Sequence, residues 1–413
     1  MKICINALGL KPATTGGLEI YFLNLIKSLC DFDKENEYYI FLNNKSTKKT
    51  IQPYINSRIK LVYFSQLYTS VAGMFLIVFT RPKTLYRLLV KELYRVLFSK
   101  NIYEVDTTGI YGKIINLDRF GMDVIHFPFG IIDPSFFNID SPIVLTIPDI
   151  QHEYYPDFFD KETLDLRRKL YKSSAERADI IIAISEATRN TIVEKYCINP
   201  EKIVVTYPGC SKDFIKIDDI DILNTVRERY SLPGEFLFYP AGTWPHKNHI
   251  KLLEALAILK EKYSFEKRLI MTGIAQNNFK NVTDSIEILD LGNQVAFLHF
   301  VPFDDLPIIY NLATMMVFPS LFEGFGIPLL EAMNVGLPIV SSDRTSIPEV
   351  VGDAGVYFNP DSAEDMAEKI YHLWRNNNLK ESLVRKGHEK AKLFTPKNTA
   401  EKTITAYKLA KHK

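Results

Sequence analysis

The chain has 413 residues, which is long for one hydrophobic core and sufficient for two domains. Its 50 Lys and Arg residues nearly balance its 49 Asp and Glu residues, so the net charge of +1 gives no reason to expect a nucleic-acid partner. The four cysteines form no CxxC pair, which argues against a disulfide framework or a zinc site and favours a reducing compartment.

The first residues, MKICINALGL, lack the pattern of a signal peptide. No run of about 18 apolar residues indicates a transmembrane helix. We therefore expect a cytoplasmic protein, with peripheral attachment to the inner face of the plasma membrane left open.

The first half of the chain alternates short apolar runs with helical patterns. Lys2 to Ala7 predicts a strand, and Gly16-Gly17 precedes apolar residues at helical spacing over 18–29. Strand, glycine turn and helix in this order are typical of the first unit of a Rossmann-like half, although the glycine order of a dinucleotide site is absent. A turn without a ligand is the alternative for these glycines. Further strands are expected at 38–42, 58–64, 123–127, 143–147, 180–184 and 203–206.

Residues 65–120 are longer than an ordinary crossover connection. Within them, the segment 71–100 begins with an apolar run too short to span a bilayer and continues into a strongly basic stretch. Three of the basic residues share one helical stripe: Arg87, Lys91 and Arg95. A basic amphipathic helix beside an apolar patch is typical of binding to an anionic membrane surface. Packing of the apolar side on the first domain is the alternative.

The second half alternates strictly between strands and helices, which predicts a parallel sheet covered on both faces. Strands are expected at 236–241, 268–272, 295–298, 314–318, 339–341 and 356–358. Helices are expected at 249–263, 282–291, 304–311, 327–335 and 363–390, with a last helix from Thr395. The turn-rich, acidic stretch 207–221 separates the halves, so we predict domains over 1–212 and 213–392.

The segment Phe318 to Glu331, FPSLFEGFGIPLLE, joins a predicted strand to a predicted helix. Gly324 and Gly326 let the backbone approach a ligand closely because neither carries a Cβ atom. The loop ends at a helix N-terminus, whose unpaired N–H groups favour phosphate. Glu323 and Glu331 repel phosphate but accept hydrogen bonds from sugar hydroxyls. The segment therefore predicts a site for a sugar nucleotide.

A second loop, AGTWPHKNH, follows the first strand of the second half. Ligands of parallel sheets bind where strands end, so Lys247 is placed to meet a diphosphate as a point charge. His246 has a near-neutral intrinsic pKa and would add a second, pH-dependent charge when protonated. His246 and His249 form HxxH, but no third ligand is evident and we predict no metal site.

The glutamate spacing, the two glycines and Pro328 resemble the signature of retaining glycosyltransferases of family 4. The flanking stretches, LHFVPFDDLPIIYNLATMMVFPS and GLPIVSSDRTSIPEVVGDAGVYFNP, are similar to the same family, which includes bacterial cell-surface glycosyltransferases. The resemblance implies an α/β protein of GT-B architecture, with two Rossmann-like domains whose parallel sheets face a central cleft. It also implies that the C-terminal helix, 393–413, packs back on the first domain. From their own apolar and basic pattern, residues 65–120 are predicted to form an insertion that faces acceptor or membrane.

The resemblance assigns roles to residues of the second domain. Glu323 would contact the donor sugar, and Glu331 the ribose hydroxyls. The other residues that would bind the donor are Gly242, Thr243, His246, Lys247, Asn248, Gly324, Phe325, Gly326 and Ile327. Thr243 and His246 stand where the family usually has an arginine, so either one cation is missing from this site or a protonated His246 supplies it.

In the first domain, the resemblance implies that Gly16 and Gly17 line the cleft. The His-Asp pair of many relatives reads Pro148-Asp149 here, and His152 follows three residues later. We predict that Asp149 and His152 line the site, with His126 second, and that these three act in catalysis with Lys247 and Glu323. A hydrogen-bonded structural histidine is the alternative for either His.

The sequence thus predicts a retaining hexosyltransferase that uses a nucleotide sugar and a lipid-linked or oligosaccharide acceptor. GDP-mannose is the favoured donor, with UDP-glucose and UDP-N-acetylglucosamine as alternatives. We expect neither a cofactor nor a metal ion, because Lys247 and the helix dipole can replace a divalent ion. A sugar-nucleotide 2-epimerase and a non-catalytic sugar-nucleotide-binding subunit remain as alternatives of other classes.

Overall fold

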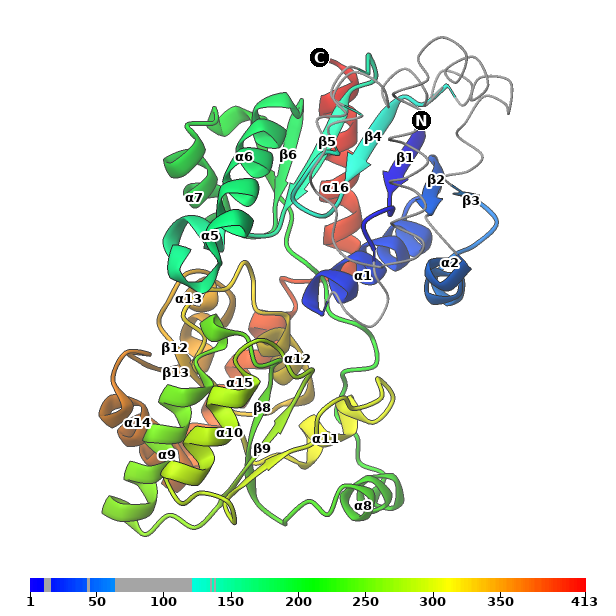
Figure 1. Cartoon of the computed structure of the whole chain (residues 1–413). Coiled ribbons are helices and arrows are strands. Elements are labelled where there is room, and N and C mark those ends of the chain that lie inside the picture. The colour runs from blue at the N-terminus through cyan, green and yellow to red at the C-terminus, as the bar shows by residue number, and fades with distance from the viewer. Residues whose placement is uncertain (11–15, 43–44, 64–120, 134–135, 137–138) are drawn as a thin grey trace.

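The computed structural model describes residues 1–10, 16–42, 45–63, 121–133, 136 and 139–413. The predicted insertion, 65–120, and its membrane-facing stretch, 71–100, therefore lie outside the described residues. Figure 1 shows two α/β bodies, one above the other, with the C-terminal helix returning to the upper one.

The first body is built on a seven-stranded sheet in the order β3-β2-β1-β4-β5-β6-β7, and neighbouring strands in the described residues pair in parallel. Its strands are β1 (Lys2–Asn6), β2 (Glu37–Leu42), β3 (Ile59–Tyr63), β4 (Val124–Phe127), β5 (Ile143–Ile147), β6 (Ile180–Ala183) and β7 (Ile203–Val205). Its helices are α1 (Gly17–Phe32), α2 (Lys45–Ile51), α5 (Gln151–Tyr154), α6 (Lys161–Arg177) and α7 (Glu186–Tyr196). Strands such as β5 are apolar and buried along their whole length, as expected for a parallel sheet covered on both faces.

The second body has a six-stranded parallel sheet in the order β10-β9-β8-β11-β12-β13. Its strands are β8 (Phe236–Pro240), β9 (Arg268–Thr272), β10 (Val295–Phe297), β11 (Met315–Phe318), β12 (Ile339–Ser342) and β13 (Gly355–Phe358). Its helices are α8 (Ile220–Arg229), α9 (His249–Tyr263), α10 (Phe279–Ile288), α11 (Leu306–Leu312), α12 (Ile327–Val335), α13 (Ile347–Val351), α14 (Ala363–Arg375) and α15 (Asn377–Ala391).

The predicted α/β class with two parallel sheets is confirmed. In each sheet the strand order reverses at one point, between β1 and β4 in the first and between β8 and β11 in the second. Ligands of open parallel sheets bind at such switch points, outside the carboxyl ends of the strands. The fold alone therefore directs attention to the loops that follow β8 and β11.

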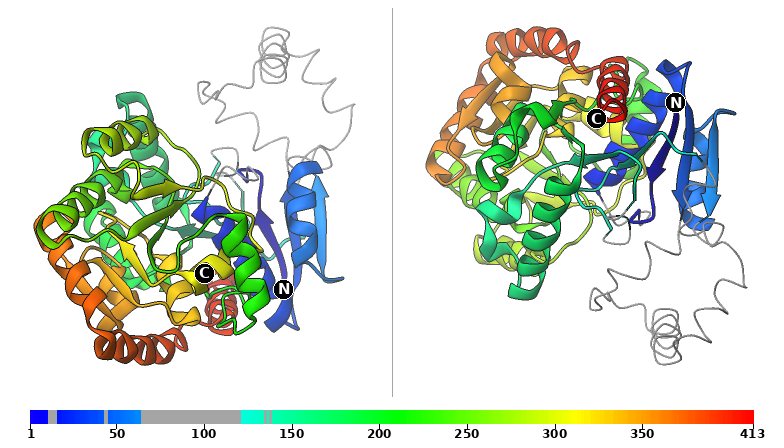
Figure 2. Two further views of the ribbon diagram at one scale, coloured as in Figure 1. Left: turned by 90° about the horizontal axis from the view of Figure 1, so that it is seen from below. Right: turned by 90° about the horizontal axis from the view of Figure 1, so that it is seen from above.

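The C-terminal helix, α16 (Pro396–Lys411), packs against the first body, although the chain reaches it from the second. Tyr407 on this helix contributes its hydroxyl to a 2.9 Å hydrogen bond with Nδ1 of His126 on β4. Lys411 pairs with Asp123 at 2.8 Å. Both views in Figure 2 show α16 (red) beside the first body, so the two bodies are connected by two chain crossings.

Several helices differ from the expectation, and helices α2, α5, α8 and α13 were not predicted at all. The predicted helix 363–390 is two helices, because the side chain of Asn376 accepts a hydrogen bond from the Leu379 N–H and starts α15. The predicted helix 282–291 lies at Phe279–Ile288, where Phe279 packs on Phe297. Helix α6 was not predicted because most of its residues are polar; Asp160 caps its N-terminus by accepting from the Thr163 N–H.

Among the described residues, no helix combines the length and the apolar character needed to cross a membrane.

Candidate active site

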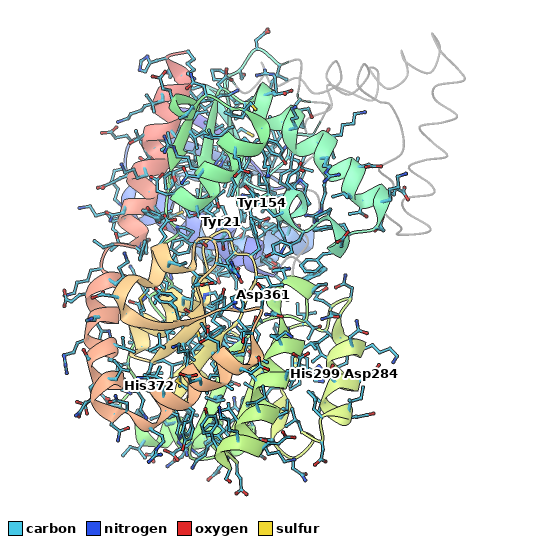
Figure 3. All side chains as sticks on the ribbon, turned by 90° about the vertical axis from the view of Figure 1, so that its left-hand side faces the viewer. Tyr21, Tyr154, Asp284, His299, Asp361 and His372 are labelled. Carbon is cyan, nitrogen blue, oxygen red and sulfur yellow. The ribbon has the colours of Figure 1, made fainter. Side chains whose placement is uncertain are left out.

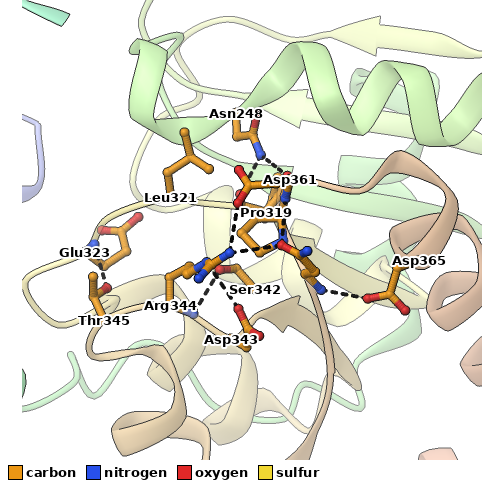
Figure 4. Close-up of polar contacts among 12 residues, drawn as sticks. Asn248, Pro319, Leu321, Glu323, Ser342, Asp343, Arg344, Thr345, Asp361 and Asp365 are labelled. Carbon is orange, nitrogen blue, oxygen red and sulfur yellow. Dashed lines mark hydrogen bonds and ion pairs between the residues drawn. The ribbon is translucent and has the colours of Figure 1, made fainter. Parts of the chain in front are cut away.

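Two loops of the second body meet at its switch point: the β8 loop (residues 241–248) and the β11 loop (residues 319–326). The Leu321 N–H donates to the His246 carbonyl at 2.8 Å. The Asn248 side-chain amide donates to the Pro319 carbonyl at 3.2 Å, as Figure 4 shows. The two predicted halves of the sugar-nucleotide site therefore form one bonded unit, in which Asn248 has a structural part.

The ion pair between Lys247 and Glu323 lies at the centre of this unit. Nζ of Lys247 is 2.6 Å from Oε1 of Glu323, and the two side chains are 19% and 11% exposed. The Tyr239 hydroxyl donates to the Lys247 carbonyl at 2.7 Å, and the Glu323 N–H donates to Oγ1 of Thr345 at 3.0 Å. Both charged residues are thus held by their own backbones, and one cation and one carboxylate face the same space.

The β11 loop presents a row of backbone donors. Within the described part of the chain, the N–H groups of Gly324, Phe325, Gly326 and Ile327 donate to no protein acceptor. Gly326 has φ of +97°, a conformation that favours glycine, and it directly precedes α12. Unpaired N–H groups at a helix N-terminus are suited to anionic oxygens. This arrangement can bind the phosphates and hydroxyls of a sugar nucleotide.

Glu331 lies on α12 and is almost fully buried. The Tyr310 hydroxyl donates to its Oε2 at 2.6 Å. Burial raises the pKa of Glu331 to about 7, and the bond from Tyr310 opposes that rise. Tyr310 is itself enclosed by Phe214 and Phe238 at ring distances of 5.2 and 5.0 Å. The sequence did not single out Tyr310 as the partner of this carboxyl.

The first residues of the β8 loop have a structural role. Thr243 is fully buried, and its hydroxyl accepts from the Gln276 N–H at 2.8 Å. A Cβ atom on Gly242 would lie 3.0 Å from the Ile274 carbonyl, so the two chain segments approach closely there. Neither residue replaces the arginine that the family pattern would place at this loop.

The surroundings of His246 disfavour the predicted protonated, positively charged form. Burial, with a smaller contribution from Lys247, holds the pKa of His246 well below its usual range. The imidazole is therefore neutral near physiological pH. The second histidine of the HxxH pair, His249, is buried and packs against Tyr239. Lys247 supplies the positive charge of the β8 loop.

The first body faces this unit with the loop after β5. A Cβ atom on Gly324 would lie 2.0 Å from the Pro148 carbonyl, so the β11 loop touches the first body directly. The neighbouring Asp149 lies within electrostatic reach of both Lys247 and Glu323. Burial raises the pKa of the Asp149 carboxyl, while a bond from the Gln151 N–H and the charge of Arg167 lower it. The structure thus brings Asp149 to the ion pair.

The two histidines of the first body lie in its interior. His152 is fully buried, bonds to the Tyr196 hydroxyl at 3.1 Å and packs on Tyr171. His126 is also fully buried, with Thr146 at 2.8 Å from Nε2 and Tyr407 at Nδ1. Burial lowers the pKa of each to about 3. These contacts favour the structural alternative for both residues over a place at the open cleft.

The glycines of the first body precede α1. Gly16 has φ of +56° and ψ of −127°, a backbone conformation that few other residues adopt. Among the described residues, nothing lies within 4 Å of a Cβ atom built on Gly16 or Gly17. That they line the cleft stays a prediction.

Several residues that hold the β11 loop were missed in the sequence. From the first body, the hydroxyls of Ser185 and Thr188 donate to the Gly324 carbonyl. Within the second body, the Ser346 hydroxyl is shared between the Glu323 and Phe325 carbonyls. Tyr154 packs on Phe322 at 5.4 Å, and Figure 3 shows it at the edge of the first body nearest the second. These contacts were not recognisable in the sequence, because partners in another domain, or distant in the same one, leave no local pattern.

Comparison with known proteins links both halves to one kind of enzyme. Residues 15–214 match the model of Glycosyltransferase Family 4, and residues 230–390 match Glycosyl transferases group 1. The O-antigen chain mannosyltransferase B of Escherichia coli is 31% identical over 272 residues, which are 64% of this chain and 70% of that protein. The O-antigen chain mannosyltransferase RfbU of Salmonella typhimurium is 31% identical over 230 residues, 55% of this chain and 60% of its own length.

The fold is shared with solved glycosyltransferases. Anabaena HepE, in complex with UDP and glucose, aligns with a TM-score of 0.70 at 19% identity and covers 98% of both chains. WaaG, a glycosyltransferase involved in lipopolysaccharide biosynthesis, aligns with a TM-score of 0.65 at 16% identity and covers 97% of this chain and 98% of its own. Fold and site together define a glycosyltransferase of GT-B architecture. The chain belongs to the group 1, family 4 glycosyltransferases.

Proposed function

We propose that this glycosyltransferase moves mannose from GDP-mannose to a lipid-linked or oligosaccharide acceptor in the synthesis of a cell-surface polysaccharide of the O-antigen type. Two relatives at 31% identity are O-antigen mannosyltransferases, which supports mannose as the sugar. The observation that carries the proposal is the unit of Lys247, Glu323 and the unpaired amides 324–327 at the switch point of the second sheet.

The unit fits the chemistry of the donor. As the sugar–phosphate bond breaks, negative charge grows on the departing diphosphate, and the Lys247 ammonium with the loop amides would stabilise it. Glu323, released from Lys247, would accept hydrogen bonds from sugar hydroxyls, and Glu331 from the ribose. We infer that this set works without a metal ion, since the Lys247 ammonium and the unpaired amides of the β11 loop could neutralise the phosphates.

We propose that the reaction retains the configuration of the sugar. The acceptor hydroxyl would attack C1 on the face from which the diphosphate leaves. The bond from C1 to the phosphate oxygen breaks, the bond from C1 to the acceptor oxygen forms, and the acceptor proton passes to the departing phosphate. Asp149 would then lie beside the reacting sugar, and its electrostatic interaction with Lys247 and Glu323 supports this role.

A transfer assay tests this function. The purified protein would be incubated with GDP-mannose, UDP-glucose or UDP-N-acetylglucosamine and a set of lipid-linked oligosaccharide acceptors, with products read by mass spectrometry and the anomeric configuration by NMR. Transfer of an α-mannosyl residue from GDP-mannose supports the proposal. Transfer only from a UDP-sugar overturns the choice of donor. Turnover without an acceptor would indicate an epimerase, and binding without turnover a non-catalytic subunit.

Attachment to an anionic membrane surface through 71–100 is a proposal that rests on the sequence alone. Replacement of Arg87, Lys91 and Arg95 by Glu should abolish pelleting with vesicles that contain phosphatidylglycerol. Unchanged pelleting of the triple variant would refute it.

A further inference from the structure

The N-terminus of α7, in the first body, is capped by a carboxylate from the second. Oε1 of Glu349, on α13, accepts from the Glu186 N–H at 2.8 Å, and Oε2 accepts from the Ala187 N–H at 2.9 Å. The next amide, of Thr188, donates to Oγ of Ser185 at 2.9 Å. The first three amides of the helix are therefore satisfied, two of them only while the bodies are together. A carboxylate at a helix N-terminus also gains from the helix dipole.

The same turn of α7 holds the β11 loop. Oγ of Ser185 donates to the Gly324 carbonyl at 2.6 Å, and Oγ1 of Thr188 donates to it at 3.1 Å. The same Thr188 proton can be shared with the Pro148 carbonyl, which lies 3.2 Å from Oγ1. Ser185 and Thr188 are buried in the contact between the bodies, where an unpaired carbonyl would cost free energy.

These bonds fix the direction of one backbone donor. A trans peptide is planar, so the Phe325 N–H points away from the side to which the Gly324 carbonyl points. Ser185 and Thr188 draw that carbonyl toward the first body. The Phe325 N–H, one of the unpaired donors of the β11 loop, is thereby turned away from the first-body hydroxyls.

We propose that Glu349 and Thr188 are positioning residues that couple closure of the two domains to the geometry of the donor-binding loop. Glu349 anchors the first turn of α7, and the hydroxyls of that turn orient the Gly324–Phe325 peptide for the donor. The loop would then reach its productive geometry only in the closed state. This inference rests on the proposed glycosyl transfer for its kinetic part, but the closure itself is measurable without any substrate.

Closure is tested by a distance between the bodies. Cys197, directly after α7, is exposed, whereas Cys4, Cys30 and Cys210 are buried, so a spin label can be placed on it selectively. A second label on Lys280→Cys, an 81% exposed site of α10, completes the pair. In the full-length protein, Glu349→Ala should shift the distance distribution to longer, broader values. Thr188→Val, which leaves Glu349 in place, should retain the wild-type distribution.

Kinetics test the coupling. With GDP-mannose as donor, Glu349→Ala and Thr188→Val should each lower kcat about tenfold, since each removes hydrogen bonds that hold the loop. The affinity for GDP should change less than about threefold, because GDP would bind the second domain in the open state as well. Glu349→Asp, whose shorter side chain retains the charge, should recover part of kcat. A residue that served only stability would lower the melting temperature and leave kcat of the folded protein intact.

Glu389→Gln is the matched control, because this exposed carboxylate of α15 pairs only with Lys392 in the described structure. It should leave both distance and kcat unchanged. The proposal is overturned if Glu349→Ala retains the wild-type distance distribution, or if it opens the domains without loss of kcat. If Glu349→Ala opens the domains as expected but the wild-type protein transfers no mannose, the proposed function is refuted. The role of Glu349 in domain closure would still hold.

Discussion

Nζ of Lys247 and Oε1 of Glu323 are 2.6 Å apart, across the two loops that meet at the switch point of the second sheet. The pair is mostly shielded from solvent, with exposures of 19% and 11%. A diphosphate that enters this space competes with Glu323 for the ammonium group. Donor binding would therefore exchange one charge-assisted contact for another, and free Glu323 for the sugar.

Replacement of Lys247 by Ala should lower kcat by roughly a hundredfold, because the departing diphosphate loses its cation. Initial rates with GDP-mannose measure this effect. The control is Lys267→Ala, which removes a surface lysine of the same domain that pairs with Glu235 at 2.7 Å. An unchanged kcat in the Lys247 variant would refute the role given to this residue.

Glu331 predicts a pH dependence of stability. Its pKa is raised from 4.5 to about 7 by burial, so the folded state binds a proton that the unfolded state releases. The stabilisation is complete below pH 4.5 and is lost as the pH rises to 7. Glu331→Gln should remove this slope. The difference in free energy of unfolding between variant and wild type should therefore shift in favour of the variant by on the order of 2–3 kcal/mol between pH 4.5 and pH 8. Urea unfolding at several pH values would show it; parallel curves for the two proteins would contradict it.

Tyr310, which is hydrogen-bonded to Glu331, sets the midpoint of this pH dependence. Tyr310→Phe removes the bond that lowers the pKa of Glu331, so the pH dependence of wild-type stability should move to higher pH. Affinity for GDP should rise with pH over the same range, because an ionised carboxylate accepts both ribose hydroxyls. Tyr371→Phe, on α14, serves as control for loss of a tyrosine hydroxyl. A midpoint equal in wild type and the Tyr310 variant would refute this coupling.

Much of the fold was predictable because it depends on local pattern. The apolar run Ile143–Ile147 forms the predicted strand, and the last helix begins directly after Thr395, as predicted. The break at Asn376 was missed because apolar residues continue at helical spacing on both sides of it. The polar helix α6 gave no apolar stripe of sufficient contrast to be recognised.

The candidate site was predictable only in its second half. Glu323, Lys247 and the glycines of the β11 loop lie in two short motifs, and the structure brings them together. In the first body, His126 and His152 occupy positions that pattern matching favours, yet both are enclosed by aromatic and hydroxyl partners distant in sequence. Glu349 and Tyr310 were not foreseen, because their roles depend on contacts 163 and 21 residues away.

Gly324 should tolerate no side chain. A Cβ atom there would lie 2.0 Å from the Pro148 carbonyl, and neither backbone can give way without displacing the loop or the domain contact. Gly324→Ala should therefore lower the rate of transfer about a hundredfold through misplacement of the loop. Gly292→Ala, where a Cβ atom meets nothing within 4 Å, is the control for a glycine substitution in the same domain. Equal rates for the two variants would refute the close contact.

The C-terminal helix predicts a stability effect at a distance from the site. Tyr407→Phe leaves Nδ1 of the fully buried His126 without its partner at 2.9 Å. The free energy of unfolding of the first body should fall by about 1–3 kcal/mol. Urea unfolding followed by circular dichroism would measure it, and an unchanged midpoint would show that α16 is not held by this bond.

Calorimetric titration with GDP, UDP, ADP and CDP, each repeated with Glu331→Ala, tests the central claim most directly. The account predicts that GDP binds the wild type more tightly than the other three nucleotides, and that the Glu331 variant loses about tenfold or more of that affinity. Glu389→Ala, on the surface of α15, should bind GDP as the wild type does. If none of the four nucleotides binds, or if GDP binds the Glu331 variant equally well, the two loops of the second body are not the donor site.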